Sequence, residues 1–199
     1  MSNTLTRLTI KGPNSDINDF IKSVKGSTNL DFYKILPMPF EIKYTIYPVK
    51  IISEEKYRQL WQKWMSKKIL GKLEDRMPNI GMTANHYDYL MEKYGSSNWC
   101  EWSIDTYGTK KNAYDVGEWE KMWNEATIEY TTSWSPATEF YINVSKLYPL
   151  IIFKHEFADD HDVYIGNETI VCGEIVDFQD LDEFSEEAIL LKKSFDIKL

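Results

Sequence analysis

The stretch "ATIEYTTSW", residues 126–134, alternates between two kinds of position, and this pattern decides the fold class. One face of the alternation holds large side chains, and the other holds the small or acidic side chains between them. A period of two over nine residues is typical of a strand with one face toward a core. We therefore predict a half-buried strand, whose inward face carries Ile128, Tyr130, Thr132 and Trp134.

A helix is predicted directly after this strand. Ser135 suits a helix cap, and Pro136 suits the first helical position, where its missing N–H is not needed. The apolar spacing then predicts a helix as far as Leu147. A strand followed at once by a helix makes this region a β-α pair.

A second β-α pair opens the chain. Residues 5–11, "LTRLTIK", alternate, and the Gly12-Pro13 turn follows them. Residues 14–24 then carry apolar side chains at helical spacing, and Gly26 suits the end of that helix.

The remaining segments complete an α+β prediction. Helical patterns fill residues 53–96, and "LIIFKHEF" reads as a strand. A hairpin is expected around Gly166-Asn167, and a helix is expected at residues 180–193. Without the insertion the order is βαββαβ, the antiparallel ferredoxin-like arrangement. We expect one such domain over residues 1–199, with a helical insertion at 53–96 and an acidic C-terminal extension at 156–199.

Charge is distributed unevenly along the 199 residues, whose net charge is −8. Residues 155–191 contain no Lys or Arg and twelve acids, so the other residues carry 19 acids against 23 bases and sit near +4. A basic face for nucleic-acid phosphates is therefore not favoured. Either the acidic segment is a solvated surface, or it docks on a basic partner.

Cysteine usage and hydropathy suggest a cytoplasmic protein. Cys100 and Cys172 are the only cysteines, and no apolar run approaches the length of a membrane span. We read no secretory signal, because residues 1–12 show no basic stretch followed by an apolar one. We expect reduced thiols and no cofactor, since two cysteines cannot supply the four thiolates of an iron–sulfur cluster.

The segment "NWCEWSIDTYGTKKNAYD", residues 98–115, is either a corner of the fold or a site. Glycine permits a tight bend, and Asn and Asp side chains hydrogen-bond turns, which favours a structural role. A Gly-Thr-Lys turn could instead hold an anion with backbone N–H groups and an ammonium. The candidate ligand-binding residues are Trp102, Tyr107, Thr109, Lys110, Lys111, Asn112, Asp115 and Trp134.

Two further features are candidates for partner or metal binding. Trp61 and Trp64 lie on an aromatic helical stripe, which is either part of the core or a partner-binding face. The residues around this stripe are basic, so they could also neutralise the charge of a nucleotide. The acidic turn is either solvated, a partner surface or a metal site, and it carries Asp159, Asp160 and Asp162. We favour no metal, because no second ligand motif supports the acids.

Several motifs resemble the YubB-like family of phage- and plasmid-borne proteins. The family commonly shows N-W-x-x-W and then W-G-T-K-W-N-A-x-D; the matching positions are Asn98, Trp99, Trp102, Gly108, Thr109, Lys110, Asn112, Ala113 and Asp115. Tyr107 and Lys111 stand where the family usually has tryptophan. "LDFYKILPMP", "YTTSWSPATEF" and "CGE" resemble three further segments. The resemblance covers most of residues 4–178 and implies a ferredoxin-like fold, and it transfers no catalytic residue because the family's activity is unassigned.

The expected function is that of a non-enzymatic accessory protein of a phage or other mobile element. It would bind a host protein in the host cytoplasm and could counter a bacterial defence system. One alternative is a binder that sequesters a small anionic nucleotide, and another is a metal-dependent hydrolase. A homo-oligomer is a further possibility, and neither general nucleic-acid binding nor membrane association is expected.

Overall fold

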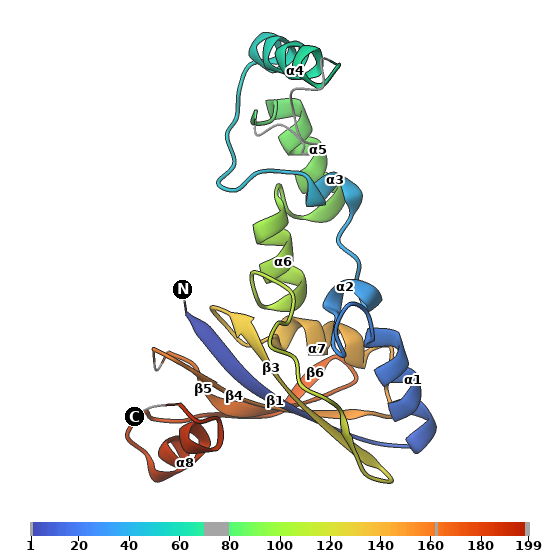
Figure 1. Cartoon of the computed structure of the whole chain (residues 1–199), viewed down its shortest axis with the longest axis vertical. Coiled ribbons are helices and arrows are strands. Elements are labelled where there is room, and N and C mark those ends of the chain that lie inside the picture. The colour runs from blue at the N-terminus through green and yellow to red at the C-terminus, as the bar shows by residue number, and fades with distance from the viewer. Residues whose placement is uncertain (1, 70–79, 162, 198–199) are drawn as a thin grey trace. The chain divides into compact units, whose positions relative to one another are not determined.

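The computed structural model describes residues 2–69, 80–161 and 163–197 (Figure 1). The chain forms two compact units. Unit 1 comprises Met1–Pro37 and Ser103–Leu199, and unit 2 comprises Met38–Trp102. The predicted helical insertion, residues 53–96, lies inside unit 2. That the whole chain acts as one domain stays a prediction.

Unit 1 is built on a sheet with strand order β2-β3-β1-β4-β5-β6 among the described residues, and each neighbouring pair is antiparallel. The strands are β1 Asn3–Lys11, β2 Glu120–Lys121, β3 Glu125–Ser133, β4 Ile152–Asp159, β5 Ile165–Val171 and β6 Glu174–Asp180. The first four, with one helix after β1 and one after β3, make the ferredoxin-like βαββαβ arrangement. The predicted α+β fold class is confirmed, and β5 and β6 extend the sheet beyond β4.

One face of the sheet carries the main core. Helices α1, Asn14–Val24, and α7, Thr138–Ser145, cover this face (Figure 1). Strand β1 alternates as predicted, so Leu8 and Ile10 are fully buried beneath the helices. The apolar spacing of α1 likewise buries Ile17 and Phe20. The buried side chains of the strand, at every second residue, and those of the helix, at every third or fourth residue, therefore pack in one apolar layer.

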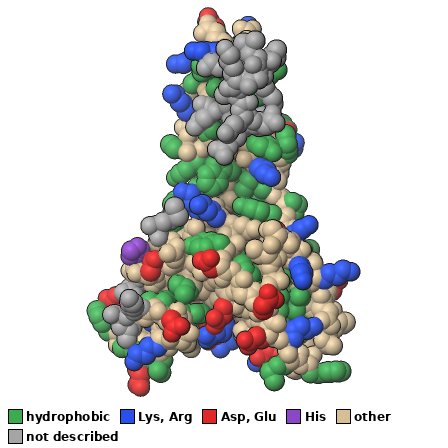
Figure 2. Space-filling view, in the orientation of Figure 1, with side chains coloured by type: hydrophobic (Ala, Val, Ile, Leu, Met, Phe, Trp, Pro, Cys, Tyr) green, Lys and Arg blue, Asp and Glu red, His purple; other side chains and the backbone are tan. Residues whose placement is uncertain are grey.

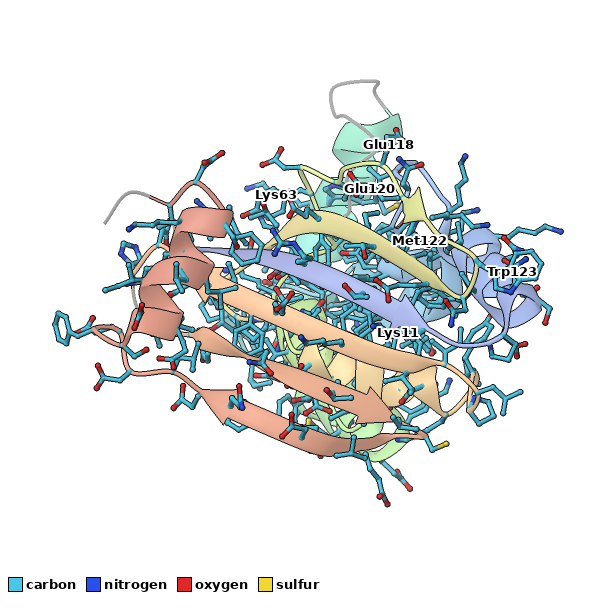
Figure 3. All side chains as sticks on the ribbon, turned by 90° about the horizontal axis from the view of Figure 1, so that it is seen from below. Lys11, Lys63, Glu118, Glu120, Met122 and Trp123 are labelled. Carbon is cyan, nitrogen blue, oxygen red and sulfur yellow. The ribbon has the colours of Figure 1, made fainter. Side chains whose placement is uncertain are left out.

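The opposite face of the sheet is largely polar. Helix α8, Glu186–Ser194, covers one end of it, where Ala188 packs with Ala158 and Ile165 (Figure 3). Elsewhere on this face, ion pairs cross from β1 to β3. Arg7 Nη2 lies 2.7 Å from Glu129 Oε1, and this pair is solvent-accessible.

Unit 2 is helical. It holds α3 Phe40–Lys43, α4 Glu54–Ile69, α5 Ala84–Tyr94 and the start of α6 Trp99–Tyr107. Its apolar core is formed by Ile42, Met82 and Leu90. Helix α5 ends as predicted at Gly95, which adopts φ 71°.

Some helices were not among the elements predicted above. The proline-rich residues 30–40 hold α2, Phe32–Ile35, and the start of α3. Asp31 caps α2, because its side chain accepts a hydrogen bond from the Tyr33 N–H. Helix α6 had not been predicted either, since its aromatic residues follow no clear amphipathic pattern.

The C-terminal turns also differ from the prediction. Gly166-Asn167 lies inside β5, and the sharp turn after β5 is instead at Cys172-Gly173, with φ values of 52° and 87°. Cys172 lies in this turn and is exposed, and its Sγ donates to the Pro149 carbonyl. Both residues of this turn have positive φ, as tight hairpin turns require.

Candidate functional site

The bend at Gly108 is built into the fold. Gly108 ends α6 with φ 78°, a conformation that favours glycine. A Cβ at this position would lie 3.0 Å from the Pro136 carbonyl oxygen and 3.1 Å from the Thr138 amide nitrogen. A larger residue here would therefore press against this backbone in addition to adopting a strained φ.

Hydrogen bonds fasten this bend to the segment after β3. Thr109 is fully buried, and its hydroxyl donates to the Ser133 carbonyl at 2.7 Å. Ser135 was expected to cap α7, but its hydroxyl donates to the Gly108 carbonyl at 2.5 Å. The helix instead begins after Ala137. Both hydroxyl protons are therefore used within the fold.

Asn112 joins the same segment to α2. Its Oδ1 accepts from the Phe32 N–H at 2.8 Å and from the Ala113 N–H at 3.0 Å. Its Nδ2 donates to Asp31 Oδ1 at 2.9 Å. One amide side chain thus fixes two distant parts of unit 1, and both of its ends are engaged.

Tyr107 lies in the aromatic core. It is fully buried, its ring packs against Phe32 and Phe140, and its hydroxyl donates to the Leu36 carbonyl at 2.5 Å. Burial raises the pKa of Tyr107, so its hydroxyl stays protonated at neutral pH. Its place in the predicted site is therefore that of a core side chain.

Other residues of the predicted site lie nearer to solvent. Lys110 Nζ lies 3.9 Å from the centroid of the Trp134 ring, a cation–π contact. Trp134 had been predicted to face inward, but it adopts φ 79° and is 38% exposed. Lys111 and Asp115 are exposed, and Asp115 has φ 48°. Trp102 belongs to unit 2, where it packs against that unit's apolar cluster.

A shallow cavity of about 610 Å³ lies beside the bend. Its lining includes Gly108 and Pro136, and its charged side chains are the acids Asp105 and Glu139. Neither Lys110 nor Lys111 lines it. Carboxylates repel a phosphate, so the charges of this cavity do not suit an anionic nucleotide.

The most exposed aromatic side chain of the described residues lies elsewhere, on the hairpin between β2 and β3. Trp123 is 83% exposed and Met122 is 72% exposed. Figure 3 shows both at the tip of this hairpin, beyond the ends of the strands. Sequence reasoning missed this pair because "KMWNEA" has no periodic pattern. A turn with two large apolar residues and little else to bury them was the available signal.

The base of this hairpin is braced. The Trp119 Nε1–H donates to the Asn29 carbonyl at 2.9 Å, and the Trp119 ring meets the edge of Phe20 at 6.1 Å. Lys121 hydrogen-bonds the Asn18 side chain on α1. At the tip, the Met122 N–H donates to the Glu125 carbonyl at 2.8 Å. Trp123 is therefore displayed from an ordered support.

A buried polar chain crosses the core, and sequence reasoning missed it. His155 Nδ1 lies 2.8 Å from Glu168 Oε1, and His155 Nε2 lies 3.0 Å from the Tyr130 hydroxyl. Tyr130 in turn lies 2.8 Å from the Tyr141 hydroxyl. All four side chains are at most 2% exposed. A substrate cannot reach these side chains in this conformation. Their hydrogen bonds therefore hold the strands together and link them to α7.

The aromatic stripe on α4 lines a small cavity within unit 2. Trp61 and Trp64 are half-buried, with ring centroids 5.3 Å apart. Trp61 and Tyr57 line a cavity of about 180 Å³ together with Phe40. That volume is below the range of most ligand pockets and suits a single side chain.

Glu41 lines the same cavity and carries a shifted pKa. A hydrogen bond from the Tyr94 hydroxyl, together with those from Lys93 and Tyr89, lowers its pKa to about 2. The Lys93 and Tyr89 bonds are both 2.9 Å long. The carboxylate is thus occupied by groups of its own unit.

The acidic turn divides into a buried and an exposed part. Asp159 is 1% exposed and accepts hydrogen bonds from the Val163 and Tyr164 N–H groups, so it shapes the turn. Asp160 is exposed and accepts from the Asn3 N–H at 3.1 Å. Asp162 lies outside the described residues. Among the described residues, no three His, Cys, Asp or Glu side chains gather as metal ligands.

The surface of unit 1 carries both signs of charge. On the face turned to the viewer, Figure 2 shows Asp and Glu side chains among Lys and Arg side chains rather than in one block. No described helix is both long and apolar enough to cross a membrane.

The fold defines a ferredoxin-like α+β protein with an added helical unit. Residues 101–195 match a family model described as the ferredoxin-like domain in Api92-like protein. No curated protein matches.

The chain is also similar to a solved structure, that of a protein api92 from Yersinia pseudotuberculosis. The two share 11% sequence identity with a TM-score of 0.52, over 92% of this chain and 98% of that chain. At this identity the likeness shows the fold alone. The narrower resemblance to YubB-like proteins of phages and plasmids stays a prediction.

Proposed function

We propose that this chain is a non-enzymatic accessory protein that binds another protein through the tip of the β2–β3 hairpin. The observation that carries the proposal is Trp123, which is 83% exposed on a braced support. Tryptophan is enriched among the residues that dominate protein interfaces, and a rigid display lowers the entropic cost of binding.

The partner that we propose is a host component. The resemblance to phage- and plasmid-borne proteins supports an origin in a mobile element, and a protein of a bacterial defence system would then be a fitting target.

The test compares two exposed aromatic residues of unit 1. Tagged wild type, Trp123→Ala and Phe184→Ala are used to capture proteins from host lysate, followed by mass spectrometry and measurement of Kd for the captured protein. Phe184 is the matched control, because it is 80% exposed and lies just before α8.

We expect Trp123→Ala to weaken binding about 30-fold, equivalent to about 2 kcal/mol for an interface anchor, and Phe184→Ala to leave it unchanged. Equal binding by Trp123→Ala and wild type would refute the hairpin as the binding surface.

An anionic nucleotide is the second candidate ligand. It is favoured by Lys110, whose ammonium lies over the partly exposed Trp134 ring and beside Lys111 in the chain. Thermal scans with ATP, GTP and cyclic dinucleotides test it, because a bound ligand raises the Tm. A rise that disappears in a Lys110→Ala/Lys111→Ala variant would favour this candidate over the protein partner.

A further inference from the structure

Strand β6 is an open edge of the sheet. It is the last strand in the order, and each of its seven residues, from Glu174 to Asp180, is exposed. Proteins usually protect such an edge with lysine, proline or a covering element. The sequence "EIVDFQD" contains neither lysine nor proline, and no described strand pairs with its outer side. Its protection is limited to its three acids and to a bulge at Val176.

The backbone of β6 has unused hydrogen-bonding groups. At its end, the Leu181 N–H donates to the Ile165 carbonyl at 2.9 Å, so this residue points toward β5. Because peptide groups alternate along an antiparallel strand, those of Phe178 and Asp180 point away from the sheet. These outward groups can receive another strand.

The side chains of β6 give that edge an apolar character. Ile175 is 43% exposed, Val176 is 59% exposed and Phe178 is 57% exposed. Strand addition combines main-chain hydrogen bonds with contacts to alternate side chains. Three large apolar groups on seven residues provide such contacts.

The charges on β6 select the partner. A second copy could pair with it antiparallel in the register centred on Asp177. Asp177 would then face its own copy, and Glu174 would face Asp180, which places like charges directly opposite. Other registers separate these pairs by a residue or two, but each still brings the three acids of one copy close to those of the other. No Lys or Arg lies between residues 155 and 191 to offset them. A strand that carries lysine or arginine would instead meet carboxylates of opposite charge.

We infer that β6 docks an extended segment of a partner protein in which basic and apolar residues alternate, and that this segment adds to the sheet as a further strand. The inference rests on the proposed function in that the chain binds protein. It uses a surface different from the hairpin tip, so either can fail alone.

The test uses dye-labelled synthetic peptides and fluorescence anisotropy on the full chain. One nine-residue peptide alternates lysine and valine. A second has the same sequence with every backbone amide N-methylated, and therefore has the same charge but lacks the N–H groups for a ladder. We expect the first to bind at least fivefold more tightly than the second, with an affinity that falls as salt rises.

Two charge reversals locate the site. Asp177→Lys on β6 should weaken binding of the lysine–valine peptide at least fivefold, because it places like charges opposite each other. Glu187→Lys, an exposed acid on α8, makes the same change of net charge off the strand and should have no such effect. Trp123→Ala should bind the peptide as wild type does.

Equal binding of both peptides, or equal weakening by both reversals, would mean charge attraction without strand addition and would overturn the inference. So would no binding, or a dimer of this chain in sedimentation that Asp177→Lys dissociates. Loss of peptide binding together with a Trp123-dependent captured partner refutes β6 alone and leaves the proposed function standing.

Discussion

The bend at residues 107–115 and the hairpin at residues 119–125 are neighbours in sequence, and both combine aromatic residues with lysine and glutamate or asparagine. Their surroundings differ sharply. Tyr107 is fully buried and Thr109 and Asn112 are bonded inward, whereas Trp123 projects into solvent. The aromatic-rich bend is thus part of the fold, whereas the aromatic-rich hairpin tip is displayed to solvent. The difference lies in the polar side chains of the bend, which hydrogen-bond to the rest of unit 1.

The largest expected effect is on the bend. Gly108→Ala should destabilise unit 1 by about 2–4 kcal/mol, because it adds left-handed strain to a clash with fixed backbone atoms. Urea unfolding measures the change.

Gly173→Ala is the matched control for this prediction. Gly173 also has positive φ, 87°, but the atoms nearest to its added Cβ belong to the flexible Lys146 side chain. We expect a cost of about 1 kcal/mol. Equal costs at the two glycines would show that the close approach at Gly108 is not a constraint.

The next effect concerns Asn112. Asn112→Ala should cost about 2 kcal/mol, because it leaves the buried Phe32 N–H without a partner and removes one of the hydrogen bonds to the Asp31 carboxylate. The same urea experiment tests this prediction. The control is Lys111→Ala, which changes the exposed neighbouring residue in the sequence. A change below 0.5 kcal/mol would contradict the fastening role given to Asn112.

The hairpin should respond in the opposite way. Trp123→Ala should change the free energy of unfolding by less than about 0.5 kcal/mol, because the side chain makes little contact to lose. Trp119→Ala should cost more, since its ring and Nε1–H brace the hairpin base. Thermal and urea unfolding of both variants would settle the contrast, which a large loss for Trp123→Ala would break.

The smallest effect is expected in unit 2 and depends on pH. The pKa of Glu41 is lowered from 4.5 to about 2, so the ionised group contributes stability above pH 4.5 that is lost as the pH falls toward 2. Glu41→Gln should therefore lower the urea midpoint at pH 5 and approach wild type near pH 2.5. A difference that is constant over this range would point to a lost contact rather than to titration.

Regular elements could be predicted from the sequence, whereas long-range polar pairs could not. The alternation at 126–134 and the apolar spacing at 14–24 gave a strand and a helix, because each pattern is local. The turn at Cys172-Gly173 was misplaced because Gly166-Asn167 carries the stronger turn signal. Gly166 instead allows β5 to come close to the Gln179 backbone.

The candidate site shows the same limit. The structural reading of Gly108 and Asn112 followed from the conformations these residue types favour. Their partners Asp31 and Ser133 could not be predicted in this way, because they lie 81 and 24 residues away from the side chains that contact them. His155 and Glu168 were read separately, as a histidine and as one acid of many, and only the pairing of β4 with β5 brings them together.

Hydrogen exchange read by mass spectrometry, with and without the captured partner, tests most directly whether the bend is scaffold and the working surface lies elsewhere. We predict that the partner adds protection at residues 119–125, and that residues 107–115, already protected in the free protein, change little. New protection confined to residues 107–115, with none at the hairpin, would contradict this account.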